Sequence, residues 1–323
     1  VHPENEIAVI LMALGFAGAG KRAAVGTSGG GFCLMAEGLS LAGMAELPIV
    51  ILVSQRTGPS TGLPTYTGQA DLLFVQHAGQ GEFPRFIVAP GTTGEAVYWS
   101  EAAMHIAWEF QVPAFILSDK TLSEGTYSTD LSLSPKILKS DLSLWDKTVP
   151  YHRYADTPSG ISPLAFPGTA GAVVKVNSYA HDEAGITTEE AETVNLMAAK
   201  RMRKEGRLAR AMDLYPQVNL SGNAAGTVAL LCWGSTAGVC DEVAGPLGLR
   251  VVRPVVLSPF PIEPLKKVLE GAGMVIAVEE NATAQLATLA ARHGIFCQKK
   301  ILRYDGRPFT PELLREKIRE ALS

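Results

Sequence analysis

Two long apolar runs rich in β-branched residues restrict the folds open to this chain. Residues 47–55, LPIVILVSQ, and residues 112–119, VPAFILSD, carry few polar side chains, which is typical of strands buried on both faces of a sheet. Helical patterns alternate with these runs and with shorter apolar runs at residues 22–28 and 85–91. Strands that alternate with helices predict an open parallel sheet covered by helices on both faces.

A second, smaller unit of the same kind follows a stretch of different composition. Apolar runs predict its strands at residues 226–235, 250–261 and 273–281. Before them, residues 187–212 predict a charged helix with acidic residues first and basic residues last, as the helix dipole favours. We interpret the basic half of this helix as a solvated or subunit-facing surface; it contains Lys200, Arg201, Arg203, Lys204, Arg207 and Arg210.

The predicted fold class is therefore α/β, with two open parallel-sheet domains. We place the first domain at residues 1–130, an interdomain segment with the charged helix at residues 131–222, and the second domain at residues 223–323. The chain begins with Val1 and enters an apolar helix at about Ile7. We therefore expect it to be a piece of a longer polypeptide.

Charge and cysteine content argue against several classes of protein. A formal net charge of −4 over 323 residues gives no electrostatic reason to expect nucleic acid or an anionic membrane as a partner. No apolar run reaches the ~20 residues that a membrane span needs, and no secretory signal is recognisable, so we expect a cytoplasmic protein. The four cysteines form no C-x-x-C pair, so we expect no metal or iron–sulfur cluster bound by this chain alone.

The turn at residues 25–35, VGTSGGGFCLM, has two functional interpretations. It fits the G-x-S-x-G pattern of a hydrolase nucleophile elbow, with Ser28 as the nucleophile, or it is a backbone turn that lies against a cofactor. A third glycine, Gly31, is not required by an elbow, and a triad belongs to one sheet rather than two. The best candidates for the rest of a triad lie far downstream: Asp241 or Glu279, followed by His293.

Two charged residues lie where a ligand of the first sheet would bind. Glu6 begins an almost wholly apolar helix; it is either a favourable charge on the helix dipole or a desolvated carboxyl group with a functional role. Arg56 follows the run at residues 47–55, at the carboxyl end of a predicted parallel strand. A fixed guanidinium group there suits a carboxylate substrate, although pairing with Asp71 or Glu82 is an alternative.

Several segments together resemble the alpha subunit of 2-oxoacid:ferredoxin oxidoreductases, especially the 2-oxoglutarate type. The resemblance begins at residues 4–65, ENEIAVILMALGFAGAG to SQRTGPSTGLPT, and continues through GQADLLF, GEFPRFIVAPG, ISPLAFPGT, HDEAGITTE, LSPFP and VEENATAQL. It covers nearly the whole chain. It implies a thiamine diphosphate-binding pyrimidine module in the first domain and a transketolase C-terminal-like module in the second.

The resemblance also implies an activity and the residues that perform it. The family oxidatively decarboxylates a 2-oxo acid, here expected to be 2-oxoglutarate, to an acyl-CoA and passes electrons to ferredoxin. Glu6 matches the glutamate that activates the cofactor, and Arg56 matches the arginine that holds the substrate carboxylate. Thr61 and Thr65 lie in the same loop and are further substrate-binding candidates. The turn is expected to line the aminopyrimidine pocket through Thr27, Ser28, Gly29, Gly30 and Phe32.

The same resemblance implies a divided enzyme. The chain has no G-D-G…N signature for a magnesium-held diphosphate, so a beta subunit would share thiamine diphosphate and carry Mg²⁺ and an iron–sulfur cluster, in a heterodimer or a dimer of heterodimers. A Y-P-I-T-P-S-like segment that relatives carry before the glutamate is absent, so the first module is expected to lack its first strand. Ala284 stands where relatives usually have glycine. Three alternatives stay open: a serine hydrolase using Ser28, a related thiamine enzyme with another acceptor or substrate, and a structural subunit.

Overall fold

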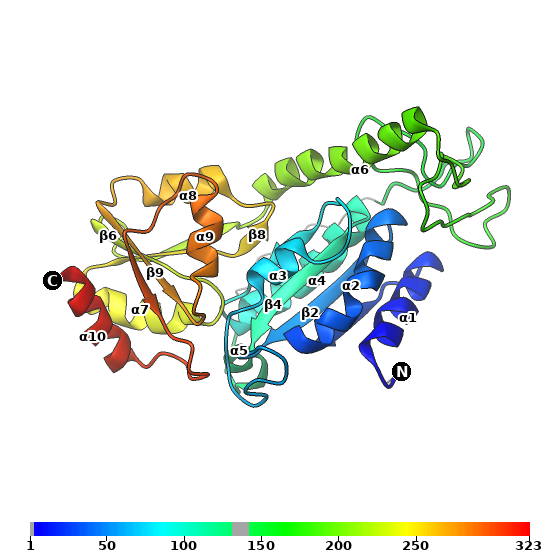
Figure 1. Cartoon of the computed structure of the whole chain (residues 1–323). Coiled ribbons are helices and arrows are strands. Elements are labelled where there is room, and N and C mark those ends of the chain that lie inside the picture. Colours follow the sequence, from blue (N-terminus) through cyan, green and yellow to red (C-terminus); the bar gives the residue numbers. More distant parts are fainter. Residues whose placement is uncertain (1–2, 131–141) are drawn as a thin grey trace.

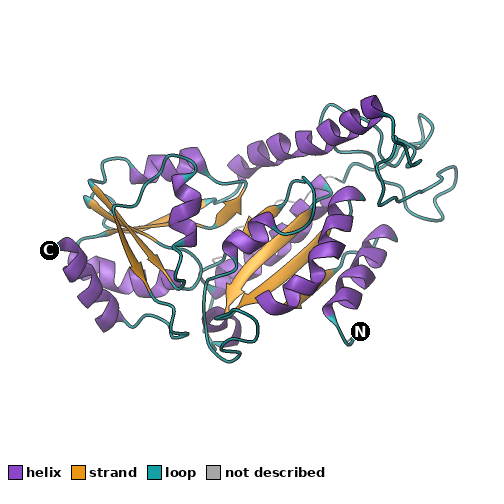
Figure 2. Cartoon of the chain, viewed as in Figure 1, coloured by secondary structure: helices purple, strands orange, loops and turns teal. Residues whose placement is uncertain are grey.

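Two five-stranded sheets flanked by helices form two neighbouring units. The computed structural model describes residues 3–130 and 142–323, so part of the predicted interdomain segment lies outside the described residues. Figure 1 shows the two units beside each other, with the C-terminus in the second, and Figure 2 shows helices covering the strands of both. These two mostly parallel sheets confirm the predicted α/β fold class.

The first sheet has the strand order β1-β2-β4-β3-β8. Four of its strands are parallel: β1 (Ala24–Thr27), β2 (Ile49–Gln55), β3 (Phe86–Val88) and β4 (Pro113–Asp119). All seven residues of β4 are buried, as the apolar run predicted. Because the four strands are parallel, the loops that follow them lie at one edge of the sheet, where ligands of such sheets bind.

Alternating side chains of β2 divide the interior of the first unit into two cores. Ile49, Ile51 and Val53 belong to the core shared with the first two helices, whereas Val50 belongs to the core of the fourth. This period of two is what a strand with both faces covered requires. The helices of this unit are α1 (Glu6–Gly18), α2 (Gly29–Met44), α3 (Leu72–His77), α4 (Thr93–Phe110) and α5 (Lys120–Glu124).

The second sheet has the strand order β10-β9-β6-β7-β5. Its strands are β5 (Val218–Gly222), β6 (Val228–Leu231), β7 (Arg250–Pro254), β9 (Met274–Glu279) and β10 (Lys299–Leu302), and only β5 pairs antiparallel. Its helices are α7 (Thr236–Leu247), α8 (Ile262–Leu269), α9 (Gln285–Ala291) and α10 (Pro311–Leu322). The edge strands β5 and β10 were not predicted, because their half-exposed residues carry no continuous apolar run.

One apolar segment serves both sheets, so the prediction of a single strand at residues 250–261 is wrong. β7 ends at Pro254, and β8 (Val256–Ser258) pairs antiparallel with β3 of the first sheet. The chain changes sheets at Val255, whose N–H donates to the Gln217 carbonyl at 2.8 Å while its carbonyl accepts from the Ala89 N–H at 2.8 Å. Residues 250–257 are all buried. Burial alone does not specify which sheet a residue joins.

Residues 142–190 contain no helix and no named strand. The charged helix α6 (Ala191–Ala211) follows them and runs toward the second unit (Figure 1). Its buried side chains are Met197, Lys200, Lys204 and Leu208, spaced so that they share one face of the helix. The interpretation of the basic half as solvated is therefore wrong for Lys200 and Lys204, which are 0% and 1% exposed. No helix in the described ranges is both long and apolar enough to cross a membrane.

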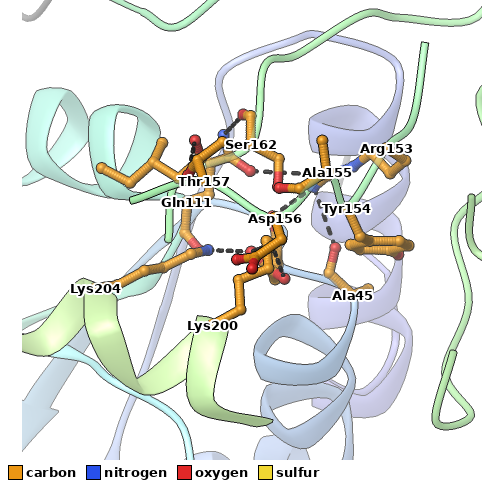
Figure 3. Close-up of polar contacts among 12 residues, drawn as sticks. Ala45, Gln111, Arg153, Tyr154, Ala155, Asp156, Thr157, Ser162, Lys200 and Lys204 are labelled. Carbon is orange, nitrogen blue, oxygen red and sulfur yellow. Dashed lines mark hydrogen bonds and ion pairs between the residues drawn. The ribbon is translucent and has the colours of Figure 1, made fainter. Parts of the chain in front are cut away.

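A buried polar cluster holds α6 against the amino ends of β2 and β4 (Figure 3). Lys200 Nζ donates to the two carboxylate oxygens of Glu46 at 2.8 and 3.0 Å, and Lys204 pairs with the same carboxylate. Arg153 donates to the Glu46 carbonyl at 2.7 Å and to the Gln111 side chain at 3.1 Å. We call these five residues the Glu46 network. Each is at most 2% exposed, and each charged group has a partner, as burial of charge requires.

Candidate functional site

The glycine turn after β1 is the centre of the candidate site. Ser28 is the N-cap of α2 in an extended conformation, and Gly29, Gly30 and Gly31 open the helix. The Ser28 side chain makes no capping hydrogen bond. The turn lies at the carboxyl edge of the first sheet. The backbone N–H groups at the start of α2 are free of intrahelical partners there, and the three glycines add no side chains that would cover them.

Glu6 reaches this turn from the start of α1. The side chain of Asn5 accepts a hydrogen bond from the Ala8 N–H at 3.0 Å, and this cap fixes where the helix begins. A Cβ atom added to Gly31 would collide with the Glu6 carboxylate and with the Thr27 hydroxyl. Glycine at this position therefore keeps open the space that the half-buried Glu6 side chain occupies.

Arg56 and Asp71 reach the same turn from the loop after β2. A Cβ on Gly29 would collide with the Asp71 carboxylate, and one on Gly30 would lie 3.9 Å from Arg56 Nη2. Burial raises the pKa of Asp71 to about 6, although the charge of Arg56 opposes this shift. Arg56 Nε and Asp71 Oδ2 are both buried without a hydrogen-bond partner. Such orphaned atoms are costly unless a ligand or water satisfies them.

A cavity of about 590 Å³ joins these groups. Its α2 start and guanidinium group attract anionic groups, while its two carboxyl groups accept hydrogen bonds from donors. One cavity can therefore hold a ligand with ring nitrogens and a carboxylate. It is lined by Glu6, Gly29, Gly30, Gly31, Cys33, Leu34, Arg56, Gly58, Pro59, Ser60, Thr61, Asp71 and Phe74.

The other predicted site residues are placed differently. Thr61 lines this cavity, whereas Thr65 is exposed outside it. Phe32 is fully buried beneath the turn, with its ring centroid 5.1 Å from that of Phe74 and 5.4 Å from that of Phe115. The binding roles of Thr61, Thr65 and Phe32 remain predictions.

Two lining residues on α2 escaped the sequence analysis. Cys33 and Leu34 follow Gly29 and Gly30 by four residues, which places them one turn further along the same side of the helix. Both are exposed. This spacing was the signal that could have indicated them.

No catalytic triad forms around Ser28 among the described residues. The Glu279 carboxylate is buried and accepts hydrogen bonds from two backbone N–H groups at the start of α9. Asp241 accepts a hydrogen bond from a serine of β5, and His293 stacks on Phe260 with ring centroids 4.9 Å apart. These three groups belong to the second unit and have other partners. A nucleophile needs its base within hydrogen-bond reach, so the structure does not support the hydrolase interpretation.

The loop that carries Arg56 and Asp71 is anchored on the second unit by Gln69. The Gln69 side chain donates to the Trp233 carbonyl at 2.8 Å and accepts from the Glu280 N–H at 3.0 Å, and its backbone N–H donates to the Glu280 carbonyl at 2.8 Å. Gln69 is 0% exposed and does not line the cavity. Gln69 therefore fixes the position of the loop without contacting the cavity.

Comparison with known proteins agrees with this geometry. Residues 1–200 match the family described as pyruvate flavodoxin/ferredoxin oxidoreductase, thiamine diphosphate-binding. The chain is 36% identical over 337 residues to the 2-oxoacid:ferredoxin oxidoreductase subunit alpha of Saccharolobus solfataricus, an alignment that covers 100% of this chain and 52% of that protein. The chain thus spans about half the length of such curated relatives.

Two solved structures have a similar fold. The 2-oxoglutarate:ferredoxin oxidoreductase from Magnetococcus marinus, with 2-oxoglutarate, coenzyme A and succinyl-CoA bound, gives a TM-score of 0.88 at 30% identity and covers 100% of this chain and 57% of that one. A split-gene transketolase gives a TM-score of 0.55 at 12% identity and covers 99% of this chain and 82% of that one. The second likeness concerns the fold alone.

Proposed function

The chain belongs to the pyruvate flavodoxin/ferredoxin oxidoreductase family through its thiamine diphosphate-binding domain, and we propose that it acts as the alpha subunit of a 2-oxoacid:ferredoxin oxidoreductase. In the proposed reaction a 2-oxo acid is oxidatively decarboxylated to an acyl-CoA, and two electrons pass to ferredoxin. The similar structure with bound 2-oxoglutarate supports 2-oxoglutarate as the substrate. The observation that carries the proposal is the convergence of Glu6, Arg56 and Asp71 on one glycine turn.

The residues present fit the aminopyrimidine end of thiamine diphosphate. Gly29 and Gly31 leave room for the Asp71 and Glu6 carboxyl groups against the turn, and Gly30, which has no side chain, lets a flat ring approach the backbone between them. The orphaned atoms of Arg56 and Asp71 are groups that a bound ligand can satisfy. Thiamine diphosphate, when bound, supplies the nucleophilic carbon and the electron sink that decarboxylation of a 2-oxo acid needs.

Each site residue then has a distinct proposed role. Glu6 would hold a proton at a ring nitrogen of the cofactor, and its place at a capped helix start fixes its carboxyl group against the turn. Arg56 would bind the substrate carboxylate, for which a planar guanidinium is suited, with Thr61 and Thr65 in the same loop. Gly29 and Gly30 would line the cofactor pocket, Thr27 and Ser28 would form the turn that precedes them, and Phe32 would support the turn from the core.

A beta subunit is proposed to complete the active site. The relative from Saccharolobus solfataricus is named a subunit alpha, which supports a partner of another kind. We place the diphosphate, its Mg²⁺ and the iron–sulfur cluster on that partner, in a heterodimer or a dimer of heterodimers. This chain would then contribute the aminopyrimidine and substrate-carboxylate contacts from the carboxyl edge of its first sheet.

Viologen reduction by the assembled enzyme tests the proposal. With thiamine diphosphate, Mg²⁺, CoA and 2-oxoglutarate supplied, Glu6→Gln should lower kcat by about 10²–10⁴-fold, the range for loss of a general acid–base group. The matched control is Glu4→Gln, since Glu4 is exposed two residues before Glu6; it should keep near wild-type activity. Equal activity in Glu6→Gln and wild type would contradict the proposed role, and covalent labelling of Ser28 by a serine-directed reagent would favour a hydrolase.

A further inference from the structure

A larger cavity, of about 820 Å³, lies between the two units. Its walls include residues that follow β3 and β4 of the first sheet and others that follow β6 and β9 of the second. Open parallel sheets bind ligands at the carboxyl ends of their strands, and here these ends of two sheets share one cavity. It has no lining residue in common with the candidate active site.

The chemistry of the walls limits what this cavity can hold. Tyr98, Tyr127 and Phe309 supply aromatic surface, and Thr92, Thr121 and Ser235 supply polar backbone and hydroxyl groups. Aromatic rings pack well against a flat or apolar ligand. Among its described lining residues, none is lysine, arginine or histidine, so a ligand rich in phosphate would lack counter-charges there.

Among the described residues that line this cavity, Glu280 has a buried carboxylate oxygen without a hydrogen-bond partner. It is 4% exposed; its Oε1 accepts from the Phe309 N–H at 3.2 Å, while its Oε2 is buried without any donor. Burial, together with the nearby charge of Asp119, raises the pKa of Glu280 to about 8. Arg303 donates instead to Asp305, at 2.9 and 3.1 Å.

Glu95, a second carboxyl group that lines the same cavity, has hydrogen-bond partners on both oxygens. Glu95 accepts hydrogen bonds from Arg253 on both oxygens, each at 2.6 Å, and one from the Gly91 N–H at 2.8 Å. Its pKa stays below the usual value, because these bonds outweigh burial. No cation of the described chain donates a hydrogen bond to Glu280, and the charge of Arg303 only partly offsets the rise in its pKa.

We propose that the interdomain cavity is a second ligand site, for a small organic cation. An ammonium or amidinium group would donate to Glu280 Oε2, and an attached aromatic or apolar body would pack against Tyr98, Tyr127 and Phe309. Such a ligand supplies both the donor and the positive charge that the described lining residues do not provide. The proposal goes beyond the proposed function and does not depend on it, because it concerns a different cavity.

Benzamidine, a flat cation, is the probe, and benzoate is its anionic counterpart of similar shape. Calorimetric titration of the full chain in its native assembly, at about pH 9 so that Glu280 is ionised, should detect benzamidine binding at millimolar concentration and none for benzoate. Glu280→Gln should weaken benzamidine binding about tenfold or more, because a charge-assisted hydrogen bond becomes a neutral one. Glutamine retains the oxygen that accepts from the Phe309 N–H, so this variant is expected to fold.

A cavity-filling variant tests the location. Gly238 on α7 lines the cavity, and a Cβ there would meet no atom within 4 Å, so Gly238→Leu should fill the space and abolish binding. Gly245→Leu is the matched control on the same helix, equally open but outside the cavity, and should bind as wild type does. The proposal is overturned if benzamidine does not bind, if benzoate binds equally well, or if Gly238→Leu binds unchanged.

Discussion

The strands β2 and β4 lie between two groups of charged residues that are paired to very different extents. At the amino ends, the Glu46 carboxylate contacts Lys200 and Lys204 and has no orphaned oxygen. At the carboxyl end of β2, Arg56 Nε and Asp71 Oδ2 are buried without partners. Complete pairing is what a structural cluster needs, whereas incomplete pairing leaves groups that a ligand can satisfy.

The same contrast appears in the protonation of the two acids. Burial alone would raise the pKa of Glu46, but Lys204, Lys200 and Arg153 hold it well below its usual range. Burial raises the pKa of Asp71 to about 6, and Arg56 offsets only part of that effect. The first sheet thus has a carboxyl group with a lowered pKa near the amino ends of its strands and one with a raised pKa near their carboxyl ends.

The largest expected effect on stability comes from removing the carboxylate of the fully paired Glu46 network. Glu46→Gln leaves two buried lysines without their carboxylate and should lower the free energy of unfolding by about 3–5 kcal/mol. Urea denaturation followed by circular dichroism measures the loss. Glu37→Gln, at an exposed position of α2, is the control and should change it by less than about 0.5 kcal/mol. A loss no larger than that of the control would mean that the network contributes little.

The pH dependence of that loss identifies its cause. Burial lowers the pKa of Lys204 to about 7 and also lowers that of Lys200, while Glu46 raises both; without Glu46 the lysines release their protons at still lower pH. The unfolded state is the same in both proteins, so the deficit depends only on protons held in the folded states. The deficit of Glu46→Gln should therefore be large below about pH 7 and shrink as the pH rises through about 7, where the folded wild type also releases the Lys204 proton. A deficit that stays constant with pH would indicate lost packing instead of stranded charge.

Asp71→Asn tests the incompletely paired group at the carboxyl end of β2. It should raise the stability of the protein, whereas Glu46→Gln lowers it. The raised pKa of Asp71 means that the stability present below its unfolded pKa is lost as the pH rises through about 6. At neutral pH and without cofactor, asparagine removes this penalty and should stabilise the protein by about 1–3 kcal/mol. Thermal denaturation at about pH 4 and pH 7 measures it. Equal stability of both proteins at neutral pH would show that solvent or Arg56 already compensates the charge.

Ser28→Ala should have the smallest effect. The Ser28 side chain makes no capping hydrogen bond, so its loss should cost less than about 0.5 kcal/mol. Viologen reduction should remain near wild type if Ser28 only lines the turn through its backbone. Loss of all activity on replacing this hydroxyl would revive a nucleophilic role.

The sequence predicted those parts of the molecule whose neighbours are local or periodic. β2 and β4 were predicted because strands buried on both faces have continuous apolar sequences. The pairing of Lys200 with Glu46 was not predicted, because 154 positions separate them and a charged helix face indicates solvent by default. The turn at Gly29 was predicted from its glycines, but the collision of a Cβ there with Asp71 depends on how the loop after β2 folds back.

β8 follows a strand of the second sheet in the chain but pairs with β3 of the first sheet. This arrangement makes the chain a poor candidate for gene fission. A break between the units would place β8 on the second polypeptide, while its pairing partner β3 stayed on the first. The first fragment would then expose the backbone N–H and C=O groups of β3 as a template for aggregation. Two such fragments would fold well only when they recombine, as complementing halves of one cooperative protein.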